Sequence, residues 1–203
     1  MAESPEALYA RILDAVGPDG RLPLSSGTTW DIFPWEVADG ALATKTLLGP
    51  VEAEEPRHGE DGTGCDVCEG RNTERRIWEN DAWTVSALER SGLLILMLEP
   101  REHLDYTDLD DAQAADLGRI SVWLTRIMSN LEHVGRVHVM RIGDGAAHLH
   151  LWHIARPERF PQLRGSFVVE WDDVLPAVPE EIWRADLAHV AKRLAQHDGR
   201  ALV

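Results

Sequence analysis

Three histidines lie within the HLHLWH segment of residues 148–153. Its alternation is typical of a β-strand, in which successive side chains point to opposite faces of the sheet. His148, His150 and Trp152 would then share one face, and His153 would lie on the other. Two imidazoles on one face could contact a metal ion and a ligand side by side. The simpler alternative is a pair of hydrogen-bonded histidines on a sheet surface.

Cys65 and Cys68 are the only cysteines of the chain and lie three residues apart. Two thiolates at this spacing can bind one zinc ion and leave two tetrahedral positions for other ligands. A redox-active thiol pair and two ordinary cysteines are the alternatives. His58, His103 and His148 are all candidates for completing a site with two cysteines and two histidines. The spacing alone does not choose among them.

The composition indicates a globular protein with small-molecule partners. The chain has 203 residues, is 44% hydrophobic and carries a formal net charge of −15. Such an acidic chain is a poor partner for nucleic acid, whose phosphates require basic patches. No apolar run approaches the ~20 residues of a membrane span, and the acidic N-terminus is unlike a signal peptide. We therefore expect a cytoplasmic protein with no membrane or nucleic-acid partner.

The chemistry-bearing residues must be positioned by an α+β fold, according to the hydrophobic pattern. Apolar residues at helical spacing predict helices, and continuous or alternating apolar runs predict strands. We expect one long helix inserted into an antiparallel meander, followed by a closing helix. The predicted helices are 5–16, 109–133 and 179–196, and the predicted strands are 28–33, 41–47, 77–78, 83–88, 92–98, 136–142, 147–155 and, at an edge, 168–171.

Composition shifts along the chain predict three parts. Residues 1–62 form a helix and an irregular lobe, rich in glycine, proline and acids, which we expect to fold against the main body. Residues 63–158 carry the ordered strands, the long helix and the cysteine and histidine motifs. Residues 159–203 form a C-terminal extension with a helix.

From about residue 64 to residue 156 the chain resembles the histidine-triad (HIT) superfamily of nucleotide hydrolases and transferases. The matching pieces occur in the superfamily's order. They are the CxxC pair, a strand hairpin, the segment LEPREH of residues 98–103, a long helix, a strand, a glycine turn, and the alternating histidines. The resemblance implies a HIT-like antiparallel fold and an enzyme that acts on phosphate compounds.

The resemblance also implies a structural zinc. In zinc-bearing members the metal is held by the CxxC pair, by the histidine after the central strand and by the first triad histidine. Carried over, these ligands are Cys65, Cys68, His103 and His148. A closed site of four protein ligands is structural rather than catalytic, and it would position the segment that carries His150.

The second triad histidine of the superfamily is the nucleophile, and here it is His150. The third triad position, usually histidine or glutamine, is Trp152, whose indole cannot shuttle a proton. Trp152 would stack on a ligand ring or wall the pocket, and His153 would reach the site only through a bulge. The glycine turn of residues 143–147 could offer backbone N–H groups to an anion.

Further substrate contacts are expected from the residues around this turn and after the triad. Arg141 could bind phosphate or form a surface salt bridge instead. Asp144 replaces a polar residue of the superfamily and would repel phosphate. Arg164 could supply a lost anion contact or lie in a solvated loop. With Trp152 and His153, these residues complete the candidate substrate site.

Three functions follow as hypotheses. The first is a HIT-like hydrolase or transferase that acts on a phosphate ester, anhydride or phosphoramidate through His150, with a nucleotide-like substrate. The second is a non-catalytic zinc protein that binds nucleotides or other small molecules. The third is a thiol redox protein that uses Cys65 and Cys68. The resemblance also implies a homodimer, formed through the long helix and an edge strand.

Overall fold

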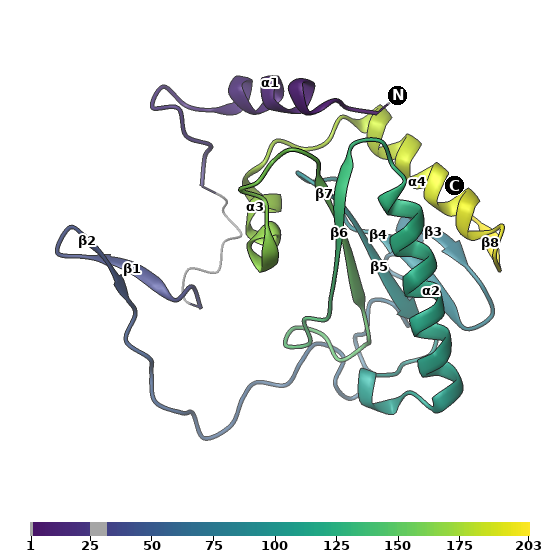
Figure 1. Ribbon diagram of the computed structural model, residues 1–203. Coiled ribbons are helices and arrows are strands. Elements are labelled where there is room, and N and C mark those ends of the chain that lie inside the picture. The colour runs from purple at the N-terminus through teal and green to yellow at the C-terminus, as the bar shows by residue number, and fades with distance from the viewer. Residues whose placement is uncertain (1, 25–31) are drawn as a thin grey trace.

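A six-stranded antiparallel sheet organises the computed structural model of the chain, which describes residues 2–24 and 32–203. The strand order is β6-β7-β5-β4-β3-β8. Figure 1 shows this sheet with helices packed beside it. The strands are β3 (Arg76–Glu79), β4 (Trp83–Ala87), β5 (Leu94–Pro100), β6 (Val134–Met140), β7 (Leu151–Pro157) and β8 (Arg200–Ala201).

Four α-helices accompany the sheet in the described part of the chain. They are α1 (Pro5–Ala15), α2 (Asp111–Ser129), α3 (Val168–Val174) and α4 (Glu180–Leu194). The long helix α2 begins at a capping box, in which Asp110 accepts a hydrogen bond from the Gln113 N–H and the Gln113 side chain accepts one from the Asp110 N–H. Such a cap satisfies two backbone donors that a helix start would otherwise leave open.

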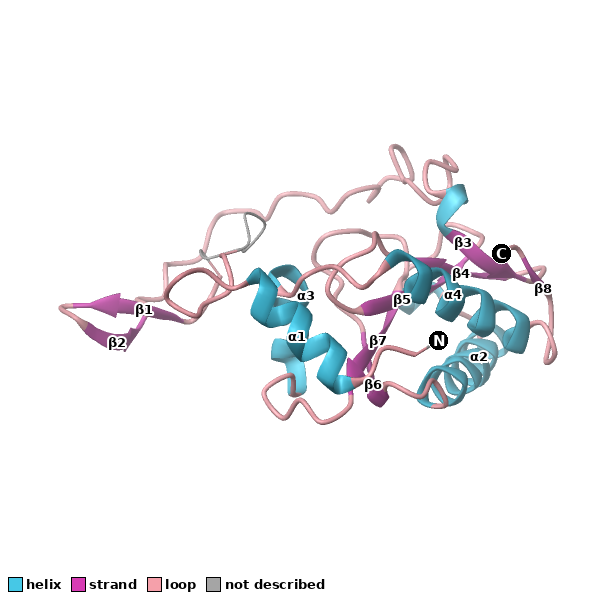
Figure 2. Ribbon diagram, turned by 90° about the horizontal axis from the view of Figure 1, so that it is seen from above, coloured by secondary structure: helices cyan, strands magenta, loops and turns pink. Residues whose placement is uncertain are grey.

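The two faces of the sheet are covered by different helices. Strand side chains alternate between faces, so neighbouring residues of β5 enter different clusters. Leu96 and Leu98 pack with the apolar faces of α2 and α4, whereas Ile95 packs with residues of α3 and of the loops around it. Figure 2 shows α1 and α3 away from the α2–α4 pair. The core therefore has two layers, one on each side of β5 and β7.

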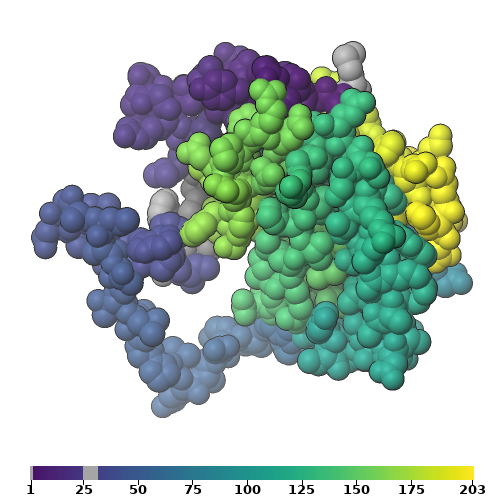
Figure 3. Space-filling model, viewed as in Figure 1, coloured from purple at the N-terminus to yellow at the C-terminus, as the bar shows by residue number. Residues whose placement is uncertain are grey.

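An N-terminal arm leaves the body of the molecule. It contains the hairpin of β1 (Trp35–Ala38) and β2 (Ala41–Thr44), whose residues are almost all exposed. Figure 3 shows it standing off from the globular part. Trp35 alone among the hairpin residues has a ring contact with the body, stacking on Phe167 with ring centroids 5.9 Å apart. Leu8 of α1 is buried, unlike the residues of the hairpin.

The predicted fold class is confirmed, with corrections to single elements. The helix predicted at 179–196 is α4, and the strand predicted at 41–47 is β2, which ends at Thr44. The strand predicted at 28–33 lies largely outside the described residues. The edge strand predicted at 168–171 is wrong, because these residues begin α3. There the apolar run is amphipathic: Val168 is buried, and Asp172 accepts hydrogen bonds from Ser91 and Leu93.

The strand predicted at 147–155 begins four residues late, as β7 at Leu151. The preceding residues pair with loops instead of the sheet. The Ala147 N–H donates to the His58 carbonyl (3.0 Å), and the Leu149 N–H donates to the Leu104 carbonyl (2.8 Å). Both histidines of interest, His148 and His150, therefore lie in the segment that enters β7.

None of the described helices combines the length and the apolar character that crossing a membrane requires. The three-part division at residues 62/63 and 158/159 stays a prediction.

Candidate functional site

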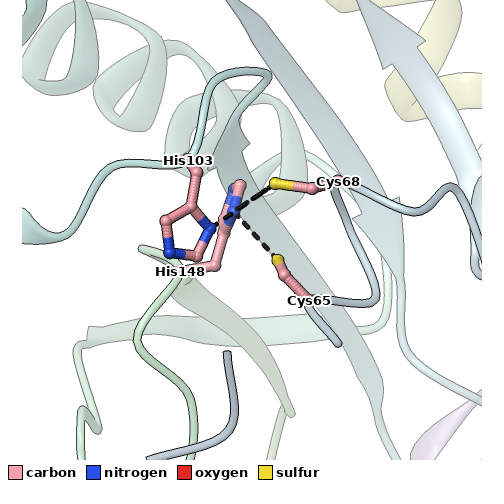
Figure 4. A group of neighbouring side chains, drawn as sticks. All are labelled: Cys65, Cys68, His103 and His148. Atoms are coloured by element: carbon pink, nitrogen blue, oxygen red, sulfur yellow. Dashed lines mark hydrogen bonds between the residues drawn. The ribbon is translucent and has the colours of Figure 1, made fainter. Parts of the chain in front are cut away.

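Four side chains from three distant segments converge beside the end of β5. Cys65 and Cys68 lie in the turn before β3, His103 follows β5, and His148 precedes β7. Their ligand atoms all lie within 4.8 Å of one another. Figure 4 shows both sulfurs facing the two imidazoles. These are the four residues that the resemblance to zinc-bearing HIT proteins implied.

The spacing of these atoms fits a tetrahedral metal site. A zinc ion with ordinary Zn–S and Zn–N bonds holds its sulfur and nitrogen ligands about 3.6 Å apart. The Nδ1 atom of His148 is 3.4 Å from Cys65 Sγ and 3.6 Å from Cys68 Sγ, and His103 Nδ1 is 3.5 Å from Cys68 Sγ. Two thiols and two imidazoles are also the donor set that zinc prefers. The residues therefore form a candidate metal site.

A second hydrogen bond orients the His148 ring for this role. Its Nε2 lies 2.9 Å from the Pro100 carbonyl oxygen. A carbonyl can only accept, so Nε2 carries the proton and the Nδ1 lone pair faces the sulfurs. Burial lowers the pKa of His148, which keeps the ring neutral. A neutral imidazole anchored through its other nitrogen is the form that binds metal.

The Cys68 thiol is unsuited to redox chemistry in the absence of metal. Both are free thiols. Burial, followed by the neighbouring Cys65, raises the pKa of Cys68 to about 11. A reactive dithiol requires a lowered pKa, because the thiolate is the nucleophile. A bound cation would instead displace the proton and stabilise the thiolate.

His150 is held with one ring nitrogen available. Its Nδ1 lies 2.8 Å from the His148 carbonyl oxygen and must donate to it. The lone pair is then on Nε2. The ring is half-buried and lines a hollow together with Met97, Ala146 and His58. A histidine that lines a hollow and has one ring nitrogen without a hydrogen-bond partner in the structure has the arrangement of a nucleophile.

Trp152 and His153 lie on opposite faces of β7, as the alternation predicted. The ring centroids of Trp152 and His150 are 6.3 Å apart in an edge-on arrangement. Trp152 also packs against the cluster that contains Ile154, and its indole N–H is buried without a hydrogen-bond partner. It therefore packs into the core next to His150 and is not among the residues that line the hollow.

His153 is fully buried beneath α2. Its Nε2 lies 2.9 Å from the Ser121 hydroxyl and its Nδ1 lies 3.1 Å from the Leu151 carbonyl. Burial lowers the pKa of His153 to about 4. No bulge turns it toward His150, since β5 and β7 pair in regular register here. A substrate contact by His153 does not fit this structure.

The expected anion-binding arginines are engaged elsewhere. Arg141 Nη2 pairs with Asp105 at 2.5 Å, which is the salt-bridge alternative considered for it. Arg57 pairs with the same carboxylate at 2.7 Å. Burial opposes ionisation there, yet hydrogen bonds led by that from Arg57 lower the pKa of Asp105 to about 2. Arg164 is exposed and donates to the Pro161 carbonyl. None of these lines the hollow beside His150.

The glycine turn before His148 is exposed at Asp144 and tied to the N-terminal segment. The His58 N–H donates to the Gly145 carbonyl (2.9 Å), and the Ala147 N–H donates to the His58 carbonyl (3.0 Å). One N–H of the expected anion nest is thus already in use. His58 was a candidate from the sequence only as a metal ligand, whereas in the structure its backbone holds this turn, which no local pattern indicated.

Comparison with known proteins places the fold. Neither a protein-family profile nor a curated relative matches the chain. Among solved structures, a histidine triad protein from Marinobacter aquaeolei matches with a TM-score of 0.50 at 24% identity, covering 63% of this chain and 94% of its own.

Two further structures agree. A hypothetical histidine triad nucleotide-binding protein from Sulfolobus tokodaii matches with a TM-score of 0.50 at 16% identity, covering 65% of this chain and 93% of its own. A histidine triad protein from Sinorhizobium meliloti matches with a TM-score of 0.50 at 19% identity, covering 61% of this chain and 93% of its own. At such identities the likeness concerns the fold.

Proposed function

The chain has the histidine-triad fold, and from this premise we propose that it is a hydrolase or transferase of phosphate compounds. His150 is the nucleophile, and a structural zinc is held by Cys65, Cys68, His103 and His148. The observation that carries the proposal is the tautomer of His150. Its Nδ1–H is committed to the His148 carbonyl, so its Nε2 lone pair is available at the hollow.

The reaction proceeds in two displacements at phosphorus. The Nε2 lone pair of His150 attacks the phosphorus atom, an N–P bond forms, and the P–O or P–N bond to the leaving group breaks. Water or another acceptor then attacks the same phosphorus, the N–P bond breaks, and its electron pair returns to Nε2. Covalent catalysis of this kind divides one difficult step into two easier ones.

The zinc supplies a rigid crosslink and no chemical step. A site closed by four protein ligands leaves no open position for substrate. His148 would anchor this segment at the metal, and His150, two residues later, would carry the nucleophilic nitrogen. The His148 carbonyl that orients His150 belongs to that anchored residue.

Trp152 narrows the class of leaving group. A histidine or glutamine beside the nucleophile could assist the departing atom, whereas an indole offers one N–H and no titratable proton. Anhydrides, which release a phosphate group as a stable anion without help from an acid, are therefore the favoured substrates, whereas alkyl esters and phosphoramidates need a proton on the departing oxygen or nitrogen.

The ligand is a small phosphate compound. The net charge of −15 favours a single small anion, bound by local donors, over the long phosphate backbone of a nucleic acid. The Sulfolobus tokodaii neighbour is described as nucleotide-binding, which supports a nucleotide-like ligand here. A homodimer and a cytoplasmic location stay predictions.

Chemical trapping tests the proposal. The zinc-loaded chain is mixed with a panel of nucleoside triphosphates labelled at the α-phosphorus and nucleoside 5′-phosphoramidates labelled at their phosphorus, and it is quenched in alkali, where phosphohistidine survives. We expect label on His150 and none in His150→Ala. His189→Ala is the matched control, because His189 is exposed on α4, outside the hollow, and should label like wild type.

The opposite result would favour the second hypothesis, a non-catalytic binding protein. The loss of the third triad histidine is the observation in its favour. If wild type takes up no label, turns over no member of the panel and binds each as His150→Ala does, the enzyme proposal is refuted. Ligand binding without turnover would leave a zinc-stabilised binding module.

A further inference from the structure

The hairpin of β1 and β2 exposes an apolar face. Val37 pairs with Leu42 across the two strands, and Trp35, two residues before Val37, points to the same side of the hairpin. Val37 is 76% exposed and Leu42 is 75% exposed. The opposite side of the hairpin carries Glu36 and three alanines. One face of the hairpin is therefore suited to packing against another apolar surface.

The residues beside the hairpin extend this surface along the arm, residues 32–51. Leu47, Leu48 and Val51 are each at least 70% exposed. A two-stranded hairpin is at best marginally stable in water by itself. Exposed apolar surface of such extent marks an interaction site. We therefore looked for a surface of matching chemistry that could cover the arm.

A cavity between α1 and α3 offers such a surface. Its volume is about 480 Å³, compared with about 190 Å³ for the hollow beside His150, and it lies within the ~300–1,000 Å³ of ordinary ligand sites. Arg21, the one charged residue among the described residues that line it, is paired with Asp19. Its walls and floor are aliphatic and aromatic, and they include Tyr9, Ile12, Phe160, Leu163, Trp171 and Leu175.

The arm and the cavity of one chain lie apart. Trp35 stacks on Phe167 and so holds the open end of the hairpin against the body. The closed end points away from α1 and α3 in both Figure 1 and Figure 2. None of the described arm residues lines the cavity. An apolar face that points outward from one copy is accessible to a second copy.

We propose that two copies of this chain exchange arms, so that the Val37–Leu42 face of each arm fills the cavity between α1 and α3 of the other copy. The rest of the arm covers the surface beside the cavity. The contact uses the same two surfaces twice and is closed, as a two-fold symmetric dimer requires. It is separate from the homodimer through the long helix and an edge strand that the resemblance implies. It also goes beyond the proposed function, since the hollow beside His150 takes no part in it.

The contact is large enough for a stable dimer. Burying one large aliphatic side chain removes about 100 Å² of apolar surface. The exposed large apolar residues of the arm are Ile32, Trp35, Val37, Leu42, Leu47, Leu48 and Val51. Two arms, together with the surfaces that they cover, therefore bury more than the ~1,200 Å² at which stable interfaces begin.

The charge distribution favours the same contact. The chain carries a net charge of −15, so two bodies repel one another. Glu36, Asp39 and Lys45 are the charged residues of the arm, and they nearly cancel. An almost neutral arm that meets an apolar cavity is therefore a route by which two acidic copies associate.

Engineered cysteines test which molecule covers the arm. Zinc-loaded Leu42→Cys is mixed with zinc-loaded Tyr9→Cys that carries a size tag, and the mixture is oxidised mildly. Neither chain holds both engineered cysteines, so a disulfide between these positions must join two copies. We expect mass spectrometry to find the two peptides joined. His189→Cys in place of Tyr9→Cys is the matched control and should give less than about one tenth of the product, because His189 is exposed on α4 outside the cavity.

Analytical ultracentrifugation measures the strength of the contact. Leu42→Asp should raise the dissociation constant of self-association at least about tenfold, because it places a carboxylate in an apolar cavity. Ala41→Asp is the matched control, since it puts the same charge on the opposite face of the hairpin, and it should stay within about threefold of wild type. Both variants should melt like wild type, because both positions are exposed on the arm.

A disulfide between copies, together with weaker association of Leu42→Asp, upholds the exchange. A disulfide that forms only within the double variant Tyr9→Cys, Leu42→Cys at high dilution would show that the arm fills its own cavity, and the exchange would be wrong. Leu42→Cys joined mainly to itself would overturn it in favour of arms that pair with each other. Equal association of wild type, Leu42→Asp and Ala41→Asp, without joined peptides, would also overturn it and leave the arm for a different protein.

Discussion

Two imidazoles separated by one leucine have different tasks because each has a different hydrogen bond. His148 donates through Nε2 to Pro100 and presents Nδ1 to the cysteines, whereas His150 donates through Nδ1 to His148 and presents Nε2 to the hollow. Leu149 between them is buried against the helices and fixes the alternation. The backbone thus selects the tautomer of each ring.

The ligand set is testable one residue at a time. Cys68→Ser should reduce the affinity for zinc at least about tenfold, because a serine hydroxyl is a poor substitute for a thiolate. His58→Ala should leave zinc content near one ion per chain, since the His58 imidazole lies 3.6 Å from Asp66 and outside the four-residue cluster. Elemental analysis after dialysis measures both. A larger loss in His58→Ala would mean that the ligand set is wrong.

His153 should make stability depend on acid. Burial lowers its pKa from 6.5 to about 4, so between these values the unfolded chain binds the proton and the native chain does not. Its contribution is complete above pH 6.5 and is lost as the pH falls toward 4, by up to about 1.4 kcal/mol for each pH unit.

Denaturant unfolding of wild type and His153→Gln from pH 7 to pH 4 measures the pH-dependent contribution of His153 to the free energy of unfolding. The difference in unfolding free energy between the two proteins should shrink as the pH falls, because glutamine does not titrate there. Zinc release affects both proteins alike and cancels in the difference. A difference that stays constant over this range would show that His153 is not held neutral by burial.

At the scale of elements, helix α2 connects the metal segment to the sheet. It follows His103 closely along the chain, covers β7 through Ser121 and His153, and packs on α4. Its apolar face was readable from the spacing of its leucines and isoleucines. Its start is defined by the capping box at Asp110.

The cap provides a prediction at this scale. Asp110→Ala should lower the unfolding free energy by about 1 kcal/mol, since the Gln113 N–H loses its acceptor. For a chain of this size that is a fall of about 2–4 °C in melting temperature. Asp111→Ala, one residue into the helix, should cost less than half as much, because it removes only a charge near the helix dipole. Equal losses in a thermal melt would argue against the cap.

At the scale of the whole molecule, the candidate metal site brings together three segments that lie far apart in the chain. It ties the turn at Cys65 to the end of β5 and to the entrance of β7. The arm of β1 and β2, in contrast, is exposed over most of its length and contributes little to this core. Stability should therefore depend on the metal far more than on the arm.

Removing zinc tests this dependence. A strong chelator should lower the melting temperature by about 10 °C or more, because metal binding is coupled to folding and each kcal/mol is about 2–4 °C at this size. The Cys65→Ser, Cys68→Ser double variant should already melt at the lowered temperature without chelator. Adding the chelator should lower its melting temperature no further. An unchanged melting temperature, in a protein that elemental analysis shows to be free of zinc from the start, would contradict the metal assignment.

The sequence alone correctly predicted those elements and motifs whose hydrophobic pattern or residue spacing is strong and local. The apolar run of β5, the periodic faces of α2 and α4, and the ordered motifs of the HIT resemblance all survive in the structure. The alternation of residues 148–153 correctly separated Trp152 from His153. Local pattern sufficed there because burial of one face determines both the element and the direction of its side chains.

Tertiary structure alone decided the rest. The pattern of residues 168–171 predicted a strand, but these residues begin helix α3. In the helix the adjoining Asp172 accepts hydrogen bonds from Ser91 and Leu93, which are distant in the chain. The sequence left Arg141 open between phosphate binding and a salt bridge, and its partner is Asp105. The sequence did not indicate that Glu99 lines the same hollow as His150. Each of these outcomes depends on a partner far away in the chain. Pairing between distant residues is set by packing, and no local pattern of residues encodes it.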